Sequence, residues 1–130
     1  MEIRAFEPRD LEQTIALCAA EGWLSYCADP QRTLRAFTAP NVICLVGVED
    51  DRVVGFAQCL TDGAIRAYLA NIAVDGSHRG HGIGKRLVEE LLTRCSAVYI
   101  DLLSTEGAHG FYRTFPHREF PGYRLHPRSE

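Results

Sequence analysis

The chain lacks the features that would carry it into or across a membrane. None of its apolar runs approaches the roughly 18 residues of a membrane span. Its first residues, Met1 to Arg4, do not have the basic-then-apolar layout of a secretory signal. The five cysteines are odd in number and form no Cys-x-x-Cys pair. We therefore expect reduced, mostly buried thiols in a cytoplasmic protein that binds no membrane.

The chain also lacks an excess of positive charge. Its 14 Lys and Arg residues against 17 Asp and Glu residues give a net charge of −3, whereas nucleic-acid binding favours a basic patch. His109, His117 and His126 lack the paired spacing of metal ligands, and there is no Gly-x-Ser-x-Gly elbow. We therefore expect no nucleic acid, no bound metal and no serine-hydrolase chemistry. A length of 130 residues fits one domain, spanning residues 1–130.

The most informative segment is a glycine-rich loop that follows an apolar, strand-like run from Tyr68 to Val74. This loop leads into an amphipathic helix, whose first N–H groups have no partner within the helix and whose dipole adds positive charge. Arg79 and Lys85 supply two cations. This combination suits a bound phosphate or pyrophosphate. The loop glycines are Gly76, Gly80, Gly82 and Gly84.

The spacing excludes two well-known phosphate sites. A P-loop requires Ser or Thr after its lysine, but Arg86 follows Lys85. A dinucleotide fingerprint requires Gly-x-Gly-x-x-Gly after a first strand, whereas these glycines alternate and lie past the middle of the chain. The pattern that remains is Arg79-x-x-Gly82-x-Gly84. The alternative interpretation is a glycine-rich connection that binds no ligand.

This pattern resembles the pyrophosphate-binding motif of the GNAT superfamily of N-acetyltransferases. The resemblance implies acetyl-CoA as the acetyl donor, no metal, and a backbone N–H near Ile72 as the donor to the oxyanion. It is also compatible with a homodimer. The residues expected to bind the coenzyme are Ile72, Ala73, Val74, Arg79, Gly80, His81, Gly82, Ile83, Gly84 and Lys85.

A second landmark is Ala108-His109-Gly110-Phe111-Tyr112. It is similar to the small-residue-then-aromatic pattern of the family's last helix, and the resemblance implies that Tyr112 protonates the departing thiolate. The alternative is that the aromatic residues only pack the helix, which we favour for Phe111. The chain departs from the family pattern at Pro116-His117, where Gly-Phe is frequent, and at Thr105, where Asn is frequent.

The general base is harder to assign, because the expected strand from residue 64 to 74 contains no carboxylate. Asp101, in an otherwise apolar strand, is a candidate for a catalytic or amine-binding role, with a structural hydrogen bond as the alternative. Asp62 lies at a turn, and Glu106 is expected to cap the last helix. A water chain is the remaining candidate.

The acceptor wall is expected at Trp23 and Tyr26, which either hold an amine by cation–π contact or anchor the core. Three functions follow from the resemblance. The leading one is transfer of an acetyl group to a primary amine of a small molecule, by direct attack in a ternary complex. The others are acetylation of a protein lysine or N-terminus, and coenzyme binding without catalysis.

The pattern of elements predicts an α+β fold with α/β/α layers and the topology of the GNAT fold. Its centre would be a mixed, mostly antiparallel sheet of six to seven strands with about four helices. An antiparallel meander should precede the long helix, and the next strand should return parallel to it. The expected strands are 2–6, 42–48, 53–60, 64–74, 98–103 and 120–125, and the expected helices are 10–21, 29–39, 83–95 and 105–114.

Overall fold

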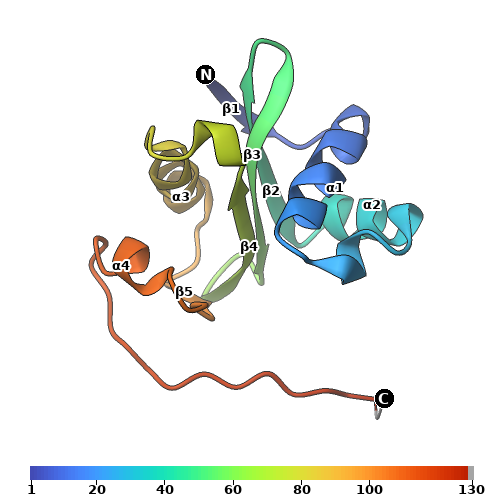
Figure 1. The fold of residues 1–130 in the computed structure, drawn as a ribbon. Helices are drawn as coiled ribbons and strands as arrows, with labels where there is room; N and C mark the ends of the chain where they lie inside the picture. Colours follow the sequence, from blue (N-terminus) through green and yellow to red (C-terminus); the bar gives the residue numbers. More distant parts are fainter. Residues whose placement is uncertain (129–130) are drawn as a thin grey trace.

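The computed structural model describes residues 1–128, as one sheet with helices on both faces (Figure 1). This confirms the predicted α+β fold. The strands are β1 (Glu2–Ala5), β2 (Val42–Glu49), β3 (Arg52–Thr61), β4 (Arg66–Val74) and β5 (Tyr99–Leu102). The α-helices are α1 (Leu11–Ala20), α2 (Pro30–Thr38), α3 (Ile83–Arg94) and α4 (His109–Tyr112), and short 3₁₀ turns occupy Pro8–Asp10, Leu24–Tyr26 and Gly76–His78.

The strands follow one another in chain order across the sheet, from β1 to β5. β1 to β4 pair antiparallel, whereas β5 is parallel to β4 after the crossover through α3. Asp50 and Asp51 form the β2–β3 turn with positive φ angles of 51° and 62°, as a two-residue hairpin of this hand requires. The predicted meander and parallel return are confirmed.

Two apolar layers hold the sheet between the helices. α1 and α2 cover one face, where Phe6, Phe37 and Phe56 lie in one buried cluster. α3 covers the other face, where Leu87 and Leu91 lie in the second cluster. Within α3, Leu92 departs from its buried leucine neighbours, since it is 51% exposed.

A β-bulge divides β4 into two halves. Gln58 of β3 pairs with Asn71, but the next residue, Cys59, pairs with Leu69, so Ala70 is an inserted residue. An inserted residue changes which face each following side chain meets. Before the bulge, Leu69 packs in the cluster beneath α3; after it, Ile72 does so. Asn71 therefore points to the side of α1 and α2.

Beyond Leu69, the edge of β4 that faces β5 has no strand partner, because the β4–β5 pairing covers only Arg66–Leu69. The N–H of Asp75 donates to the Val54 carbonyl at 2.8 Å, which makes this pair a hydrogen-bonded one. Pairs alternate along an antiparallel ladder, so Ile72, three residues earlier, directs its N–H away from β3. This N–H lies on the open edge.

The prediction of a sixth strand at residues 120–125 was wrong. Residues 113–128 contain no strand, and Phe120, Tyr123 and Leu125 are 68%, 82% and 85% exposed. The sheet therefore has five strands rather than six to seven. Pro121 has no N–H to give to a ladder, and this is the physical reason we assign.

The last helix is also shorter than predicted. α4 covers only His109–Tyr112 instead of residues 105–114. Gly107 has a φ of +91°, a conformation that interrupts a right-handed helix before it can begin earlier.

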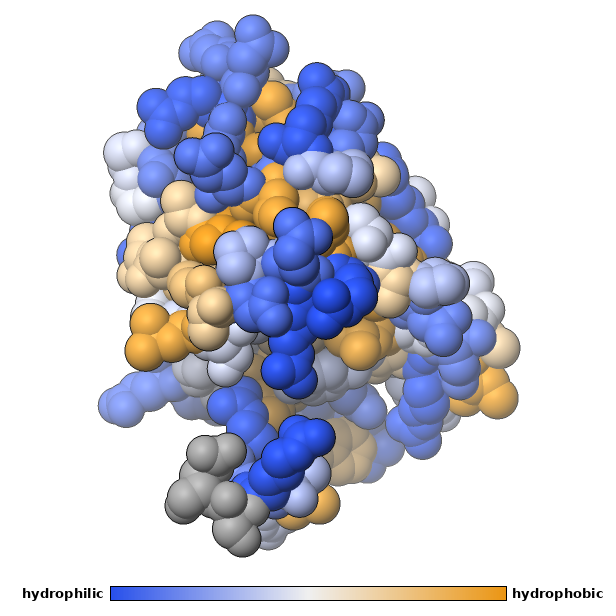
Figure 2. Space-filling model, turned by 90° about the vertical axis from the view of Figure 1, so that its right-hand side faces the viewer, coloured by the Kyte–Doolittle hydropathy of each residue, from blue (hydrophilic) through white to orange (hydrophobic). Residues whose placement is uncertain are grey.

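The surface on the side of α2 is mainly hydrophilic, with hydrophobic residues scattered between the charged ones (Figure 2). Of the helices within residues 1–128, none is both long and apolar enough to cross a membrane. The five cysteines are free, and Cys18, Cys44 and Cys59 are buried, which confirms mostly buried thiols.

Asp10 joins the first strand to the first helix in a way that the sequence did not predict. It stands at the N-cap of α1, but its side chain makes no capping hydrogen bond to that helix. Instead, its carboxylate accepts two hydrogen bonds from the Arg4 guanidinium, at 2.7 and 2.8 Å, and one from the Glu7 N–H at 2.8 Å. Asp10 is 5% exposed. The bonds from Arg4, followed by the bond from Glu7, hold the pKa of Asp10 below its usual value.

We predict that Asp10→Ala lowers the free energy of unfolding by about 3 kcal/mol, because it leaves the Arg4 charge without its partner. Because the folded-state pKa is depressed, this stability is present above the unfolded pKa of about 3.8 and is lost as the pH falls through the folded value. Urea unfolding at several pH values measures both effects. Glu89→Ala, an exposed helical carboxylate, is the control. Equal stability of the two variants would contradict the prediction.

Candidate functional site

A cleft of about 1490 Å³ opens along the free edge of β4. One end is formed by the glycine-rich loop and the start of α3, and the walls come from the α1–α2 connection and from α4. Its lining includes Glu21, Gly22, Trp23, Tyr26, Tyr68, Asn71, Ile72, Ala73, Val74, Arg79, Gly80, Gly82, Ile83, Gly84, Lys85, Glu106, Phe111, Tyr112, Arg124 and His126. Of the residues predicted from the sequence, His81 and Asp101 are outside this lining.

The glycine-rich loop presents a row of unpaired backbone donors. Within residues 1–128, no N–H from Arg79 to Lys85 has a hydrogen-bond acceptor, and the first helical bond of α3 runs from the Arg86 N–H to the Gly82 carbonyl. Gly80 and Gly82 have φ angles of +82° and +77° and open space where a side chain would stand. Donors of this kind at a helix N-terminus fit a phosphate group.

The Arg79 side chain forms an ion pair with a carboxylate at the end of α1. Its Nη2 atom lies 2.8 Å from Oε1 of Glu21, at the C-terminal end of α1, and its Nε donates to the Val74 carbonyl at 3.4 Å. The arginine side chain is 61% exposed. Sequence reasoning missed Glu21, because nothing in its local pattern connects it with a loop 58 residues away.

The two loop histidines have different neighbours. His78 Nδ1 lies 2.8 Å from Asp75, and its Nε2 lies 3.5 Å from Glu49. It therefore ties the loop to the β2–β3 turn. His81 contacts the His78 carbonyl at 3.1 Å through Nδ1, so it closes the loop on itself.

Tyr112 lies at the end of α4, half-buried against the cluster beneath α3. Burial raises the pKa of its phenol. Its hydroxyl has no hydrogen-bond partner among the described residues, and none of the buried polar side-chain atoms there is unpaired. The hydroxyl is therefore accessible in the cleft, and the raised pKa keeps it protonated.

Phe111 packs next to the phosphate loop. A Cβ placed on Gly84 would lie 3.5 Å from the Phe111 ring, so this glycine lets α4 approach the first turn of α3. Phe111 also contacts Tyr112 and Phe115 edge-to-face, with ring centroids 5.1 and 5.5 Å apart. These contacts give Phe111 the packing role that we favoured.

The predicted acceptor residues are half-buried and belong to both the core and the cleft. The Trp23 ring meets the Phe56 ring edge-on, at a centroid distance of 6.3 Å. The Tyr26 ring stacks on Phe37 at 5.7 Å, while its hydroxyl bonds to Gln58 and Asn71. Asn71 is a cleft residue that the sequence analysis missed. The available signal was its position as the only side-chain amide in the otherwise largely apolar run Ala67–Val74.

Of the three acidic residues considered above, Asp101 and Asp62 are bonded elsewhere, whereas Glu106 lines the cleft. Asp101 is exposed and pairs with Arg66 at 3.7 Å. Asp62 accepts the N–H groups of Ala64 and Ile65 at 2.8 Å in the β3–β4 turn. Glu106 lines the cleft, but no side chain caps α4. This geometry therefore supports neither a catalytic or amine-binding role for Asp101 nor a helix cap by Glu106.

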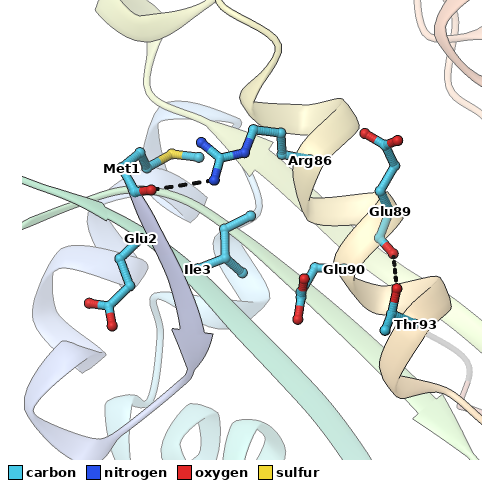
Figure 3. Close-up of a pocket in the computed structure, with 7 residues that line it drawn as sticks. All are labelled: Met1, Glu2, Ile3, Arg86, Glu89, Glu90 and Thr93. Atoms are coloured by element: carbon cyan, nitrogen blue, oxygen red, sulfur yellow. Dashed lines mark hydrogen bonds between the residues drawn. The ribbon is translucent and has the colours of Figure 1, made fainter.

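A second, smaller hollow of about 400 Å³ lies between the start of β1 and the outer face of α3 (Figure 3). There Arg86 donates to the Met1 carbonyl at 3.3 Å, and Thr93 donates to the Glu89 carbonyl at 3.1 Å. Nothing in this hollow suggests chemistry, since Arg86 serves to tether the chain start. Over residues 1–128, no three His, Cys, Asp or Glu side chains are grouped as metal ligands.

The glycine-rich loop, the helix that follows it and most of the cleft lining lie within one matched family region. A sequence model of the Acetyltransferase (GNAT) family matches residues 8–115. The chain belongs to this family. GNAT members use acetyl-CoA as the acetyl donor, and the unpaired N–H groups from Arg79 to Lys85 fit its pyrophosphate.

Individual relatives agree with this assignment. Mycothiol acetyltransferase of Rhodococcus jostii (strain RHA1) is 45% identical over 49 residues, which are 38% of this chain and 16% of that protein. The chain thus spans a small part of such relatives. A GNAT-family acetyltransferase from Streptococcus pneumoniae TIGR4 has a TM-score of 0.80 at 24% identity, covering 98% of both chains.

An aminoglycoside acetyltransferase from an uncultured soil metagenomic sample has a TM-score of 0.79 at 19% identity, covering 99% of this chain and 96% of its own. At these identities the two solved structures establish the GNAT fold, which confirms the predicted topology.

We predict that Arg79→Ala weakens coenzyme A binding by about tenfold to a hundredfold, because a charged hydrogen bond to phosphate is worth about 1.5–3 kcal/mol. Isothermal titration calorimetry measures the dissociation constant. Arg9→Ala is a matched control, since Arg9 is also an exposed arginine paired with a carboxylate, Glu7, at 2.7 Å. Unchanged affinity in Arg79→Ala would contradict a phosphate role for this side chain.

Glu21→Gln should change coenzyme affinity in the opposite direction. Phosphate must compete with the Glu21 carboxylate for the Arg79 guanidinium, so removing the charge should tighten binding about two- to fivefold. The gain should shrink as salt is raised, because both partners are accessible. A loss of affinity would mean that Glu21 instead holds Arg79 in its binding position.

Proposed function

We propose that this protein transfers the acetyl group of acetyl-CoA to a primary amine, with a small molecule as the leading acceptor class. One observation carries the proposal. The Ile72 N–H lies on an unpaired strand edge, in a cleft that has a phosphate-binding loop at one end and the Tyr112 side chain in its wall.

In this proposal the loop from Arg79 to Lys85 holds the pyrophosphate, and the open edge from Ile72 to Val74 receives the pantetheine arm. The peptide groups of Ile72 and Val74 face this edge, because they alternate with the ones bonded to β3. The arm then occupies the place beside β4 that β5 leaves free beyond Leu69.

The acceptor nitrogen attacks the thioester carbon, and the C=O electrons move to the oxygen. The Ile72 N–H stabilises the negative charge on that oxygen. The oxyanion then collapses, the C–S bond breaks, and the leaving thiolate takes the hydroxyl proton of Tyr112. The new ammonium group loses its proton to solvent, and Tyr112 is reprotonated from solvent.

In this proposal Trp23 and Tyr26 form the wall that contacts the acceptor. Both line the cleft, and the ring of each is held in place by a contact with a buried phenylalanine. A protein lysine or N-terminus is the alternative acceptor on the same scaffold. Coenzyme binding without catalysis is the second alternative, because no strand carboxylate supplies a base. A cytoplasmic location and a homodimer stay predictions.

We expect Tyr112→Phe to lower kcat by about a hundredfold or more, since it removes the proton donor, while the coenzyme dissociation constant changes less than twofold. Release of free thiol from acetyl-CoA, with a panel of amines and peptides, measures turnover. Tyr123→Phe, on a tyrosine that is 82% exposed, is the control.

Equal turnover of Tyr112→Phe and the parent protein would contradict the role of Tyr112 as the general acid. If coenzyme raises the melting temperature but no amine or peptide releases thiol, the non-catalytic alternative replaces the proposed function.

A further inference from the structure

Two of the free thiols meet beneath α3, on the face of the sheet that this helix covers (Figure 1). Cys59, on β3, belongs to the buried cluster that also contains Leu87 and Leu91. Along the chain, Leu87, Leu91 and Cys95 follow one another at intervals of four residues, so they share one face of the helix. Cys95 packs against the same cluster. The apolar stripe of α3 therefore brings a second thiol to the side of β3 where Cys59 lies.

The end of α3 is held in this position by hydrogen bonds. The Cys95 N–H donates to the Leu91 carbonyl at 2.8 Å, which closes the last turn of the helix. The Ser96 hydroxyl donates to the Gly63 carbonyl at 2.8 Å, in the β3–β4 turn. Gly63 follows Cys59 by only four residues. The helix end that carries Cys95 therefore stays next to the end of β3 that carries Cys59.

The two thiols are direct neighbours with unequal access to solvent. The Cys59 side chain is hydrogen-bonded to the Cys95 side chain, and its Sγ also lies 3.8 Å from the Leu60 carbonyl. Burial, followed by the neighbouring Cys95 thiol, raises the pKa of Cys59 to about 11, so Cys59 keeps its proton. Cys59 is 0% exposed, whereas Cys95 is half-buried. A reagent from solution can therefore meet the pair only at Cys95.

The other three thiols are arranged differently. Cys18, Cys27 and Cys44 lie in or against the cluster on the side of α1 and α2. Cys27 is half-buried like Cys95, but its Sγ donates to the Trp23 carbonyl at 3.6 Å. Within residues 1–128, none of these three thiols is hydrogen-bonded to another thiol. They therefore provide a comparison within the same molecule.

We propose that Cys59 and Cys95 form a redox modification site, at which a hydroperoxide converts the two thiols into a reversible disulfide. The Cys95 thiolate attacks one oxygen of the hydroperoxide and the O–O bond breaks, which gives a sulfenic acid and an alcohol, or water from hydrogen peroxide. The Cys59 sulfur then attacks the Cys95 sulfur, and the hydroxyl group leaves with the Cys59 proton as water. The hydroperoxide thereby accepts the two electrons that the thiols lose, and a thiol reductant reverses the reaction.

The bridge encloses the part of the chain that forms the coenzyme end of the cleft. Residues 60–94 include β4, the glycine-rich loop and α3. A cross-link restricts this segment in the unfolded chain and so stabilises a native fold that accommodates it. We expect the melting temperature of the oxidised protein to rise by about 5 °C or more. Coenzyme affinity should change less than about twofold, because Cys95 lies at the opposite end of α3 from the glycine-rich loop.

Peptide mapping tests the proposal on the parent protein. The fully reduced protein is treated with hydrogen peroxide, its remaining thiols are alkylated, and it is digested with trypsin without reductant. We expect the first cross-linked product to join the peptide of residues 53–66 to that of residues 95–113, each of which contains one cysteine. Cys18 and Cys27 share the peptide of residues 10–32, so a bridge between them appears as a loss of two hydrogen atoms within that peptide. That bridge in place of the one between Cys59 and Cys95 would overturn the proposal.

Variants separate the chemistry of the pair from general oxidation of thiols. Cys95→Ser should abolish the cross-link and leave Cys59 reduced, because the buried thiol has no access to the oxidant. Cys59→Ser should let Cys95 proceed to the sulfinic acid, since the resolving thiol is gone. Cys27→Ser, the control at a second half-buried thiol, should leave the cross-link unchanged. Sulfinic acid on Cys95 as the main product of the parent protein, or a lower melting temperature of the cross-linked protein, would contradict the proposed pairing in the native fold.

Discussion

The structure depends on one interrupted ladder. β4 and β5 share hydrogen bonds only up to Leu69 and Leu102, and beyond that point β4 keeps a free row of peptide groups inside the molecule. Free strand edges normally attract another strand. Here α4 and the α1–α2 connection flank the edge without covering it, so it remains available to an extended ligand. The coenzyme cleft is therefore a consequence of where strand pairing stops.

The bulge at Ala70 determines which face of the sheet each side chain of this strand meets. Before it, alternate side chains of β4 fill the layer beneath α3; after it, the alternation is reversed. Asn71 consequently meets Tyr26 and Gln58 on the opposite layer, while Ile72 keeps its side chain in the core and its N–H in the cleft. Neighbouring residues of one strand thus direct their polar groups to two different sides of it.

Much of this arrangement was predictable from local signals. The strand-loop-helix pattern around Arg79 and Gly82 predicted the loop whose N–H groups have no acceptor in the described structure, and the strand and helix patterns predicted β2 to β5. The failures involved information from distant parts of the chain. Glu21 and Arg79 are joined across the sheet, and the bulge that orients Asn71 leaves no local signature. Residues 120–125 form no strand despite their alternating apolar residues, because alternation alone does not indicate whether a sheet edge is available to pair with them.

Gly84 links two parts of the site that the chain encodes far apart. Its missing side chain admits the Phe111 ring, and Tyr112 follows directly on α4. A methyl group here would be in ordinary van der Waals contact with the ring, whereas a longer side chain would occupy the space that the ring fills. A bulky substitution in the glycine-rich motif would therefore also disturb the short helix that carries the proposed proton donor.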